Sequence, residues 1–148
     1  MKRLLVVEDD PNTLHGLEDL LRNDGYWVIG VTRGHQALSA VSREHIDVVL
    51  CDYKLPDIDG LQVCRKLRKL RPHLALFMLT AYNNTDIIRG AKECGIQRVF
   101  QKPLDLDELF KTLFSLSAPP PLHLSSLEGS GAEAEQPKKK LFAKFLEG

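Results

Sequence analysis

The sequence predicts an α/β fold with a doubly wound parallel sheet, followed by a separate C-terminal tail. Short β-branched and aliphatic runs alternate five times with segments of helical periodicity, which is typical of βαβ units around a parallel sheet. Several runs are apolar throughout, as in strands that helices cover on both faces. The chain has 148 residues, 43% of them hydrophobic and 27% charged, which suits one folded domain with one core.

Five apolar runs predict the strands. The first four are rich in Val, Leu and Ile, and the last is the shortest and least apolar. In chain order the predicted strands are Leu4–Val7, Tyr26–Val31, Val48–Cys51, Leu74–Leu79 and Arg98–Phe100.

Five segments between and after these runs predict helices with one apolar face toward the sheet. Each repeats apolar residues at spacings of three and four, as Leu14, Leu17 and Leu21 do in the first. Pro11 suits a first helical turn, and Gly25 and Gly95 suit positions just beyond helix ends. The predicted helices are Thr13–Arg22, Gln36–Glu44, Leu61–Leu70, Asp86–Cys94 and Asp105–Leu116.

The composition changes after residue 117, so we expect a domain over 1–117 and a tail over 118–148. Three consecutive prolines and a Ser/Gly/Glu stretch predict a linker. The basic end, Lys138–Leu146, pairs Leu and Phe at a spacing of four, which would suit an anionic membrane or a partner's groove. Nine residues make only a marginal helix, so a disordered, solvated tail is favoured over membrane contact.

Charge and cysteine content exclude several classes of function. Lys plus Arg and Asp plus Glu number 20 each, so the net charge is zero and no nucleic-acid partner is expected. The basic cluster around the third helix is interpreted as a solvated outer face. Three cysteines without C-x-x-C spacing predict neither a disulfide framework nor a zinc site, and a reducing cytoplasm is the expected location.

Polar residues follow four of the predicted strands, where ligands bind in open parallel sheets. They are Glu8, Asp9 and Asp10 after the first strand, Asp52 after the third, Thr80 after the fourth and Lys102 after the fifth. Converging carboxylates repel one another unless a cation neutralises them, and hard oxygen ligands suit Mg²⁺. A lysine and a hydroxyl could surround a transferring phosphoryl group, and a carboxylate can accept it as an acyl phosphate. The sequence therefore predicts a Mg²⁺-dependent aspartyl-phosphate site.

Four segments make this prediction more specific. They are Leu4–Asp10 (LLVVEDD), Asp52–Gly60 (DYKLPDIDG), Leu79–Ala81 (LTA) and Lys102–Pro103. Their order and spacing resemble those of the response-regulator receiver domain, the CheY-like family, over about residues 1–117. The resemblance implies a five-stranded parallel sheet in the order 2-1-3-4-5, helices on both faces, and a single-domain response regulator of two-component signal transduction.

The resemblance also implies roles for individual residues. Asp52 would accept a phosphoryl group from a sensor histidine kinase or a histidine phosphotransfer protein, in a protein that is otherwise no enzyme. Glu8, Asp9, Asp52 and the backbone carbonyl of Lys54 would hold Mg²⁺. Thr80, Ala81 and Lys102 would bind the phosphoryl oxygens, and the Lys102–Pro103 bond is expected to be cis. The phosphorylated protein would switch binding to an unidentified downstream protein or pass the phosphoryl group along a relay.

Three positions depart from the pattern or tune it. The family usually has Tyr or Phe three residues before the lysine, where this chain has Val99, and strand alternation directs the neighbouring Phe100 to the opposite face. The usual aromatic switch is therefore in question. By analogy Tyr82 and Lys54 flank the path to the phosphorus, and we expect the Tyr82 ring to hinder the hydrolytic water.

Two other functions remain open. The first is a receiver-like scaffold that is not phosphorylated and acts through its surface and tail, which Val99 favours and the complete acceptor site disfavours. The second is a hydrolase of the haloacid-dehalogenase type, which expects a second acid two residues after the nucleophile, where this chain has Lys54. Asp57 and Asp59 are interpreted as solvated turn residues.

Overall fold

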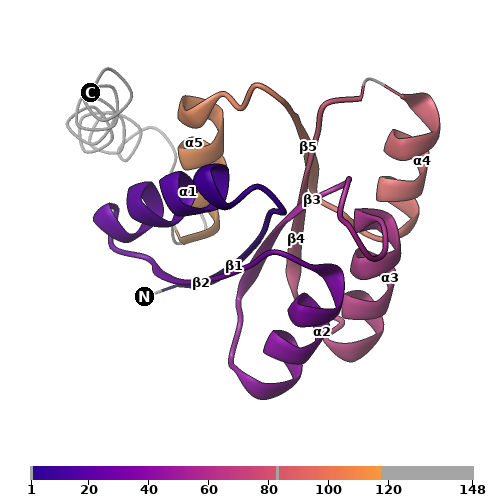
Figure 1. The fold of residues 1–148 in the computed structure, drawn as a ribbon, viewed down its shortest axis with the longest axis horizontal. Helices are drawn as coiled ribbons and strands as arrows, with labels where there is room; N and C mark the ends of the chain where they lie inside the picture. Colours follow the sequence, from indigo (N-terminus) through magenta and orange to yellow (C-terminus); the bar gives the residue numbers. More distant parts are fainter. Residues whose placement is uncertain (1, 83, 118–148) are drawn as a thin grey trace, which may run out of the picture. The chain divides into compact units, whose positions relative to one another are not determined.

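A computed structural model describes residues 2–82 and 84–117, and its elements alternate strand and helix along the chain (Figure 1). The expectations for the 118–148 tail lie outside the described residues. The chain divides into two compact units, Met1–Leu104, which holds the sheet and four helices, and Asp105–Gly148, which holds the fifth.

The strands form one parallel sheet in the order β2-β1-β3-β4-β5, as predicted. Their bounds differ from the predicted ones by a residue or two, because ladder pairing decides where a strand ends. Asp52 and Thr80 thus close β3 and β4 as their last residues. The strands are β1 Arg3–Val7, β2 Trp27–Val31, β3 Val48–Asp52, β4 Ala75–Thr80 and β5 Arg98–Gln101.

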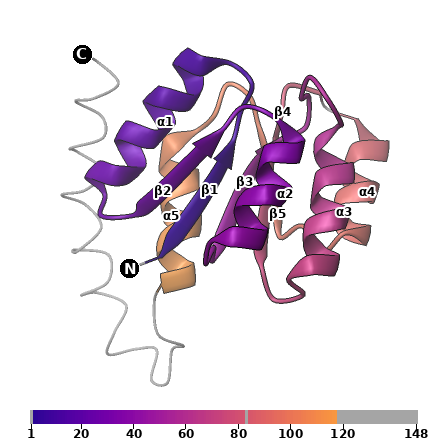
Figure 2. The ribbon, with the colours of Figure 1, turned by 60° about the horizontal axis from the view of Figure 1, so that its bottom comes forward.

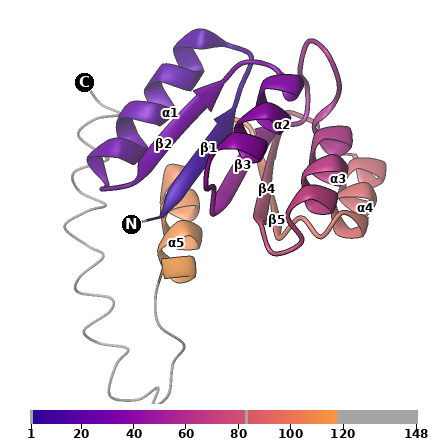
Figure 3. The ribbon, with the colours of Figure 1, turned by 90° about the horizontal axis from the view of Figure 1, so that it is seen from below.

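The helices cover both faces of the sheet in the first unit. Helix α1 lies on one side, and α2, α3 and α4 lie on the other (Figures 2 and 3). The first unit contains α1 Pro11–Asn23, α2 Gly34–Arg43, α3 Gly60–Leu70 and α4 Thr85–Glu93, and the second contains α5 Leu106–Ser117. No helix of the described ranges is long and apolar enough to cross a membrane.

The core follows from strand alternation. Leu5, Val49 and Met78 join the buried cluster that contains residues of α2, α3 and α4, while their chain neighbours are buried toward the other face. The central strands β1, β3 and β4 are apolar on both faces, as is typical of the buried strands of a parallel sheet. Because these strands are rigid and parallel, their carboxyl ends hold the residues that follow them at one edge of the sheet.

Candidate functional site

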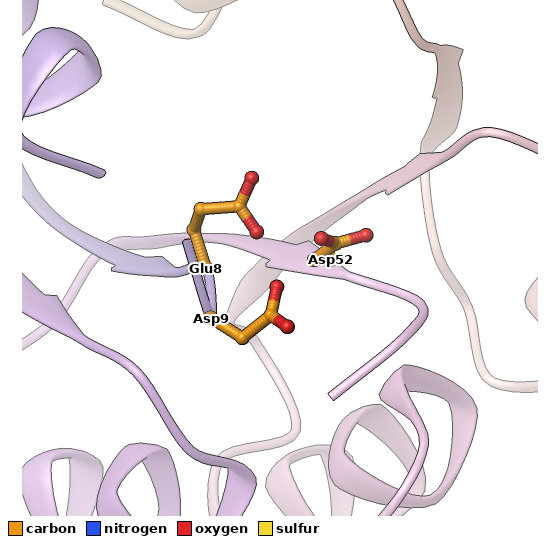
Figure 4. Close-up of side chains that lie close together, drawn as sticks. All are labelled: Glu8, Asp9 and Asp52. Carbon is orange, nitrogen blue, oxygen red and sulfur yellow. The ribbon is translucent and has the colours of Figure 1, made fainter. Parts of the chain in front are cut away.

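Three carboxylates from two strand ends converge at the carboxyl edge of the sheet (Figure 4). An oxygen atom from each of Glu8, Asp9 and Asp52 lies within 4.8 Å of the others. Glu8 and Asp52 are only 1% and 4% exposed, whereas Asp9 faces solvent. The predicted acidic cluster is therefore present, with two buried carboxylates and one open to the outside.

Lys102 supplies the positive charge of this cluster. Its Nζ donates to Asp52 Oδ2 at 2.6 Å and to Glu8 Oε1 at 3.0 Å. Burial lowers the pKa of Lys102, but its bonds to the two carboxylates outweigh that effect and raise the pKa. Lys102 therefore stays charged and balances part of the negative charge. The Lys102–Pro103 bond is cis, as expected.

Glu8 has the least favourable environment in the cluster. Burial and the neighbouring Asp52 carboxylate raise its pKa to about 8, against the opposing effect of Lys102. Its Oε2 is buried and has no hydrogen-bond partner among the described residues. A buried, unsatisfied carboxylate oxygen is costly, and a divalent cation with its bound water would satisfy it. The donor set, all oxygen and rich in charge, fits Mg²⁺.

A cavity of about 160 Å³ opens beside the cluster. It contains every predicted site residue except the buried Glu8 and the more distant Val99. Its lining residues are Asp9, Asp52, Lys54, Thr80, Ala81, Tyr82 and Lys102. A small anion could thus reach Asp52 from solvent between the hydroxyl of Thr80 and the ammonium group of Lys102.

Thr80 and Tyr82 form one side of this cavity. The Thr80 hydroxyl accepts a hydrogen bond from the backbone N–H of Tyr82 at 3.0 Å, so it is held by its own loop. The Tyr82 side chain is 47% exposed and meets the ring of Tyr53 edge to face, with centroids 6.2 Å apart. The two rings stand on the loops that follow β4 and β3.

Val99 and Phe100 lie where strand alternation predicts. Val99 is partly buried against the cluster shared with α2, α3 and α4, and Phe100 packs against Phe77 in the other half of the core. The side chain at this position is thus Val99, which is not aromatic. Phe100 cannot take its place, because the side chain of Phe100 points to the opposite face of the sheet.

Sequence reasoning was wrong about Asp57 and Asp59. Asp59 accepts from the backbone N–H of Gln62 and caps α3, and Asp57 accepts from those of Gly34 and His35 at the start of α2. The spacing from Asp59 to Gln62 is a local capping pattern and could have been recognised. The partners of Asp57 lie more than twenty positions earlier, so the sequence carries no local signal for that contact.

The sheet order and the acidic pocket together define a doubly wound α/β protein whose site suits a divalent cation and a phosphoryl group. The family model "Response regulator receiver domain" matches residues 4–114. The chain therefore belongs to the response regulator receiver domain family, and it is a phosphoacceptor domain of two-component signal transduction.

Two curated relatives illustrate the range of this family. The chain is 32% identical over 108 residues to Sporulation initiation phosphotransferase F of Bacillus subtilis, covering 73% of this chain and 87% of the relative. It is 40% identical over 121 residues to Transcriptional regulatory protein TcrA of Mycobacterium tuberculosis, covering 81% of this chain but 47% of that one. The chain thus spans most of the first relative and about half of the second.

Solved structures agree with the fold. A CheY-like receiver domain protein of Methanospirillum hungatei has a TM-score of 0.75 and 28% identity, covering 78% of this chain and 92% of the other. The response regulator TrrA of Thermotoga maritima, in complex with Mg²⁺ and BeF, has a TM-score of 0.72 and 30% identity, covering 78% and 99%. Receiver domains bind Mg²⁺ at an acidic pocket, and the cluster of Glu8, Asp9 and Asp52 is such a pocket.

Proposed function

We propose that Asp52 accepts the phosphoryl group in this receiver domain, with Mg²⁺ held by Glu8, Asp9, Asp52 and the backbone carbonyl of Lys54. The observation that carries this proposal is the convergence of three carboxylates and the Lys102 ammonium group beside a cavity open to solvent. Family membership supports it, because receiver domains take phosphoryl groups from histidine kinases or phosphotransfer proteins.

The transfer is a displacement at phosphorus. An oxygen of the Asp52 carboxylate forms a bond to phosphorus while the bond to the donor's imidazole nitrogen breaks, and that electron pair stays on the nitrogen. Thr80, the N–H of Ala81 and Lys102 stabilise the charge on the phosphoryl oxygens. Mg²⁺, when bound, supplies the remaining charge neutralisation. The domain thus promotes its own phosphorylation and dephosphorylation and catalyses no other reaction.

The acyl phosphate serves as a signal in the cytoplasm. Its formation changes the balance of conformations and thereby the affinity for a downstream protein, or the group moves on to another histidine. The scaffold that is never phosphorylated is not favoured, because the acceptor site is complete. The hydrolase alternative lacks its second acid, since Lys54 occupies that position.

A mass measurement tests the acceptor. Wild type is incubated with a small phosphodonor such as acetyl phosphate and Mg²⁺, beside Asp52→Asn and the control Asp59→Asn from the same loop. We expect one added phosphoryl group on wild type and on Asp59→Asn, none on Asp52→Asn, and none when a chelator removes Mg²⁺. An unmodified wild type, or equal modification of Asp52→Asn, would contradict the proposal.

We also propose that Tyr82 slows hydrolysis of the acyl phosphate. Its half-exposed ring lines the cavity and is supported by Tyr53, so it restricts the approach of water to the phosphorus. We expect Tyr82→Ala to dephosphorylate severalfold faster, by roughly 3- to 10-fold, which corresponds to a barrier change of about 1 kcal/mol. Tyr26→Ala, which alters a tyrosine outside the cavity, controls for loss of an aromatic ring. An unchanged rate for Tyr82→Ala rejects this role.

A further inference from the structure

A residue from the metal-binding loop, residues 53–59 between β3 and α3, holds the start of helix α2. Asp57 Oδ1 accepts from the backbone N–H of Gly34 and Oδ2 from that of His35, both at 2.9 Å. The side chain of Arg33, the residue that precedes the helix, has no acceptor, and Gln36 Oε1 accepts from the backbone N–H groups of Thr32 and Arg33. Asp57 therefore satisfies the two N–H groups that follow those bound by Gln36, and it also meets the positive end of the helix dipole.

The contact between this loop and α2 is tight. Gly34 is buried, and a Cβ at that position would lie 2.8 Å from Ile58 Cγ1 and 3.3 Å from Asp57 Oδ1 in the loop, and 2.7 Å from Val63 Cγ2 in α3. Only glycine lets the helix start this close to the loop. The first turn of α2 and Asp57 are thus fixed against each other by packing as well as by hydrogen bonds.

The same loop carries Lys54, directly after the acceptor. The loop is closed at its neck, where the backbone N–H of Gly60 donates to the carbonyl of Tyr53 at 2.7 Å. Leu55 and Ile58 pack against the core and anchor its sides. Between these anchors, Asp57 attaches the loop to α2 by hydrogen bonds, and Asp59 attaches it to α3. Lys54 therefore lies between the hydrogen-bonded neck at Tyr53 and the packed Leu55, three residues before Asp57.

We propose that Asp57 is a positioning residue that ties the metal-binding loop to the N-terminus of α2, so that metal occupancy and the start of α2 are coupled. The proposal rests on the proposed function, in which the Lys54 carbonyl helps to hold Mg²⁺. Coupling of this kind is reciprocal: whatever frees the start of α2 weakens metal binding, and metal binding changes the surroundings of the Gly34 and His35 amides. It gives the domain a route from the acceptor to a surface helix that does not use the position of Val99.

The test is a Mg²⁺ titration followed by amide NMR on the isotopically labelled full chain, at constant ionic strength. In wild type we expect the amide signals of Gly34 and His35 to move with the same dissociation constant as those of the acidic cluster. In Asp57→Ala we expect Mg²⁺ to bind roughly 3- to 10-fold more weakly, at the low end for lost supporting partners of a metal site, and the two α2 signals to stop following the titration. Asp59→Ala, which removes a cap from α3 in the same loop, should keep its affinity within about twofold.

A second variant keeps the test decisive. Asp57→Asn retains one acceptor oxygen and should bind Mg²⁺ with intermediate affinity, and it replaces Asp57→Ala if that variant does not fold. Wild-type affinity in Asp57→Ala and Asp57→Asn, or an equal loss in Asp59→Ala, would overturn the proposal. A wild type that binds no Mg²⁺ would instead overturn the proposed function, so the two failures are distinguishable.

Discussion

At the scale of single residues, two carboxyl groups of this protein lie in opposite environments. The acidic cluster favours the neutral form of Glu8, and the start of α2 favours the charged form of Asp57. Burial raises the pKa of Glu8 to about 8, whereas the backbone N–H groups of His35 and Gly34 outweigh burial at Asp57 and lower its pKa to about 2. Both groups are carboxylates on loops at the same edge of the sheet. What separates them is that burial and the Asp52 carboxylate dominate at Glu8, whereas backbone N–H donors dominate at Asp57.

Asp57 makes the free energy of unfolding depend on pH in the acidic range. Its pKa in the folded state is below the unfolded value of 3.8, so its contribution is complete above pH 3.8 and is lost as the pH falls toward 2. We expect Asp57→Ala to lower the free energy of unfolding by about 1–2 kcal/mol at pH 6, as for a lost helix cap, and by less at pH 3. Urea unfolding at the two pH values measures this difference. A deficit that is the same at both would mean that the charge of Asp57 does not stabilise the helix.

At the scale of elements, Arg68 connects the end of α3 to the end of α4. Its guanidinium group donates to the backbone carbonyls of Cys94, Pro72, Leu74 and Gly95 at 2.7–3.1 Å. Arg71 likewise donates to the carbonyls of Leu70 and Val41. The interpretation of the whole basic cluster as a solvated face is therefore wrong for Arg68, which is half-buried, although Lys66, Lys69 and Arg71 are exposed as expected.

This connection predicts that substitutions of neighbouring basic residues lower the free energy of unfolding by different amounts. The compact ammonium group of a lysine cannot span the four carbonyls that the planar guanidinium group reaches, so we expect Arg68→Lys to lower the free energy of unfolding by about 2 kcal/mol. Lys69→Ala, one position on, should stay within about 0.5 kcal/mol of wild type. Chemical denaturation gives both values. Equal effects of the two substitutions would show that the four carbonyl contacts contribute little.

The elements themselves were predictable because each depends on local periodicity. The sequence predicted where every strand and helix lies, and the strand-end rule brought Glu8, Asp52 and Thr80 to one edge. The contacts of Asp57 and Arg68 were not predictable, because they join a side chain to backbone groups of another element. Backbone groups have the same chemistry at every residue, so no residue type marks the partner. The opposite directions of Val99 and Phe100 were predictable, because successive side chains of any strand point to opposite faces of the sheet, whatever its neighbours are.

At the scale of the whole molecule, the site is built at a cost to the fold. Two of its carboxylates are buried, Lys102 neutralises only part of their charge, and Glu8 Oε2 is left without a partner among the described residues. Such groups destabilise the native state and not the unfolded chain, in which water solvates them. The energy that folding loses at this site is available to a ligand that satisfies it, which links metal binding to global stability.

This linkage predicts that Mg²⁺ stabilises the protein specifically. At a Mg²⁺ concentration one hundred times its dissociation constant, the free energy of unfolding of wild type should rise by about 2.7 kcal/mol, if the unfolded chain has no affinity for the ion. Asp9→Asn removes the solvent-facing carboxylate of the cluster and should gain much less at the same concentration, whereas Asp19→Asn, an exposed acid on α1, should gain as much as wild type. Denaturation with NaCl at matched ionic strength separates binding from screening. If NaCl stabilises all three proteins as well as MgCl₂ does, the effect is screening, and the cluster does not hold the ion.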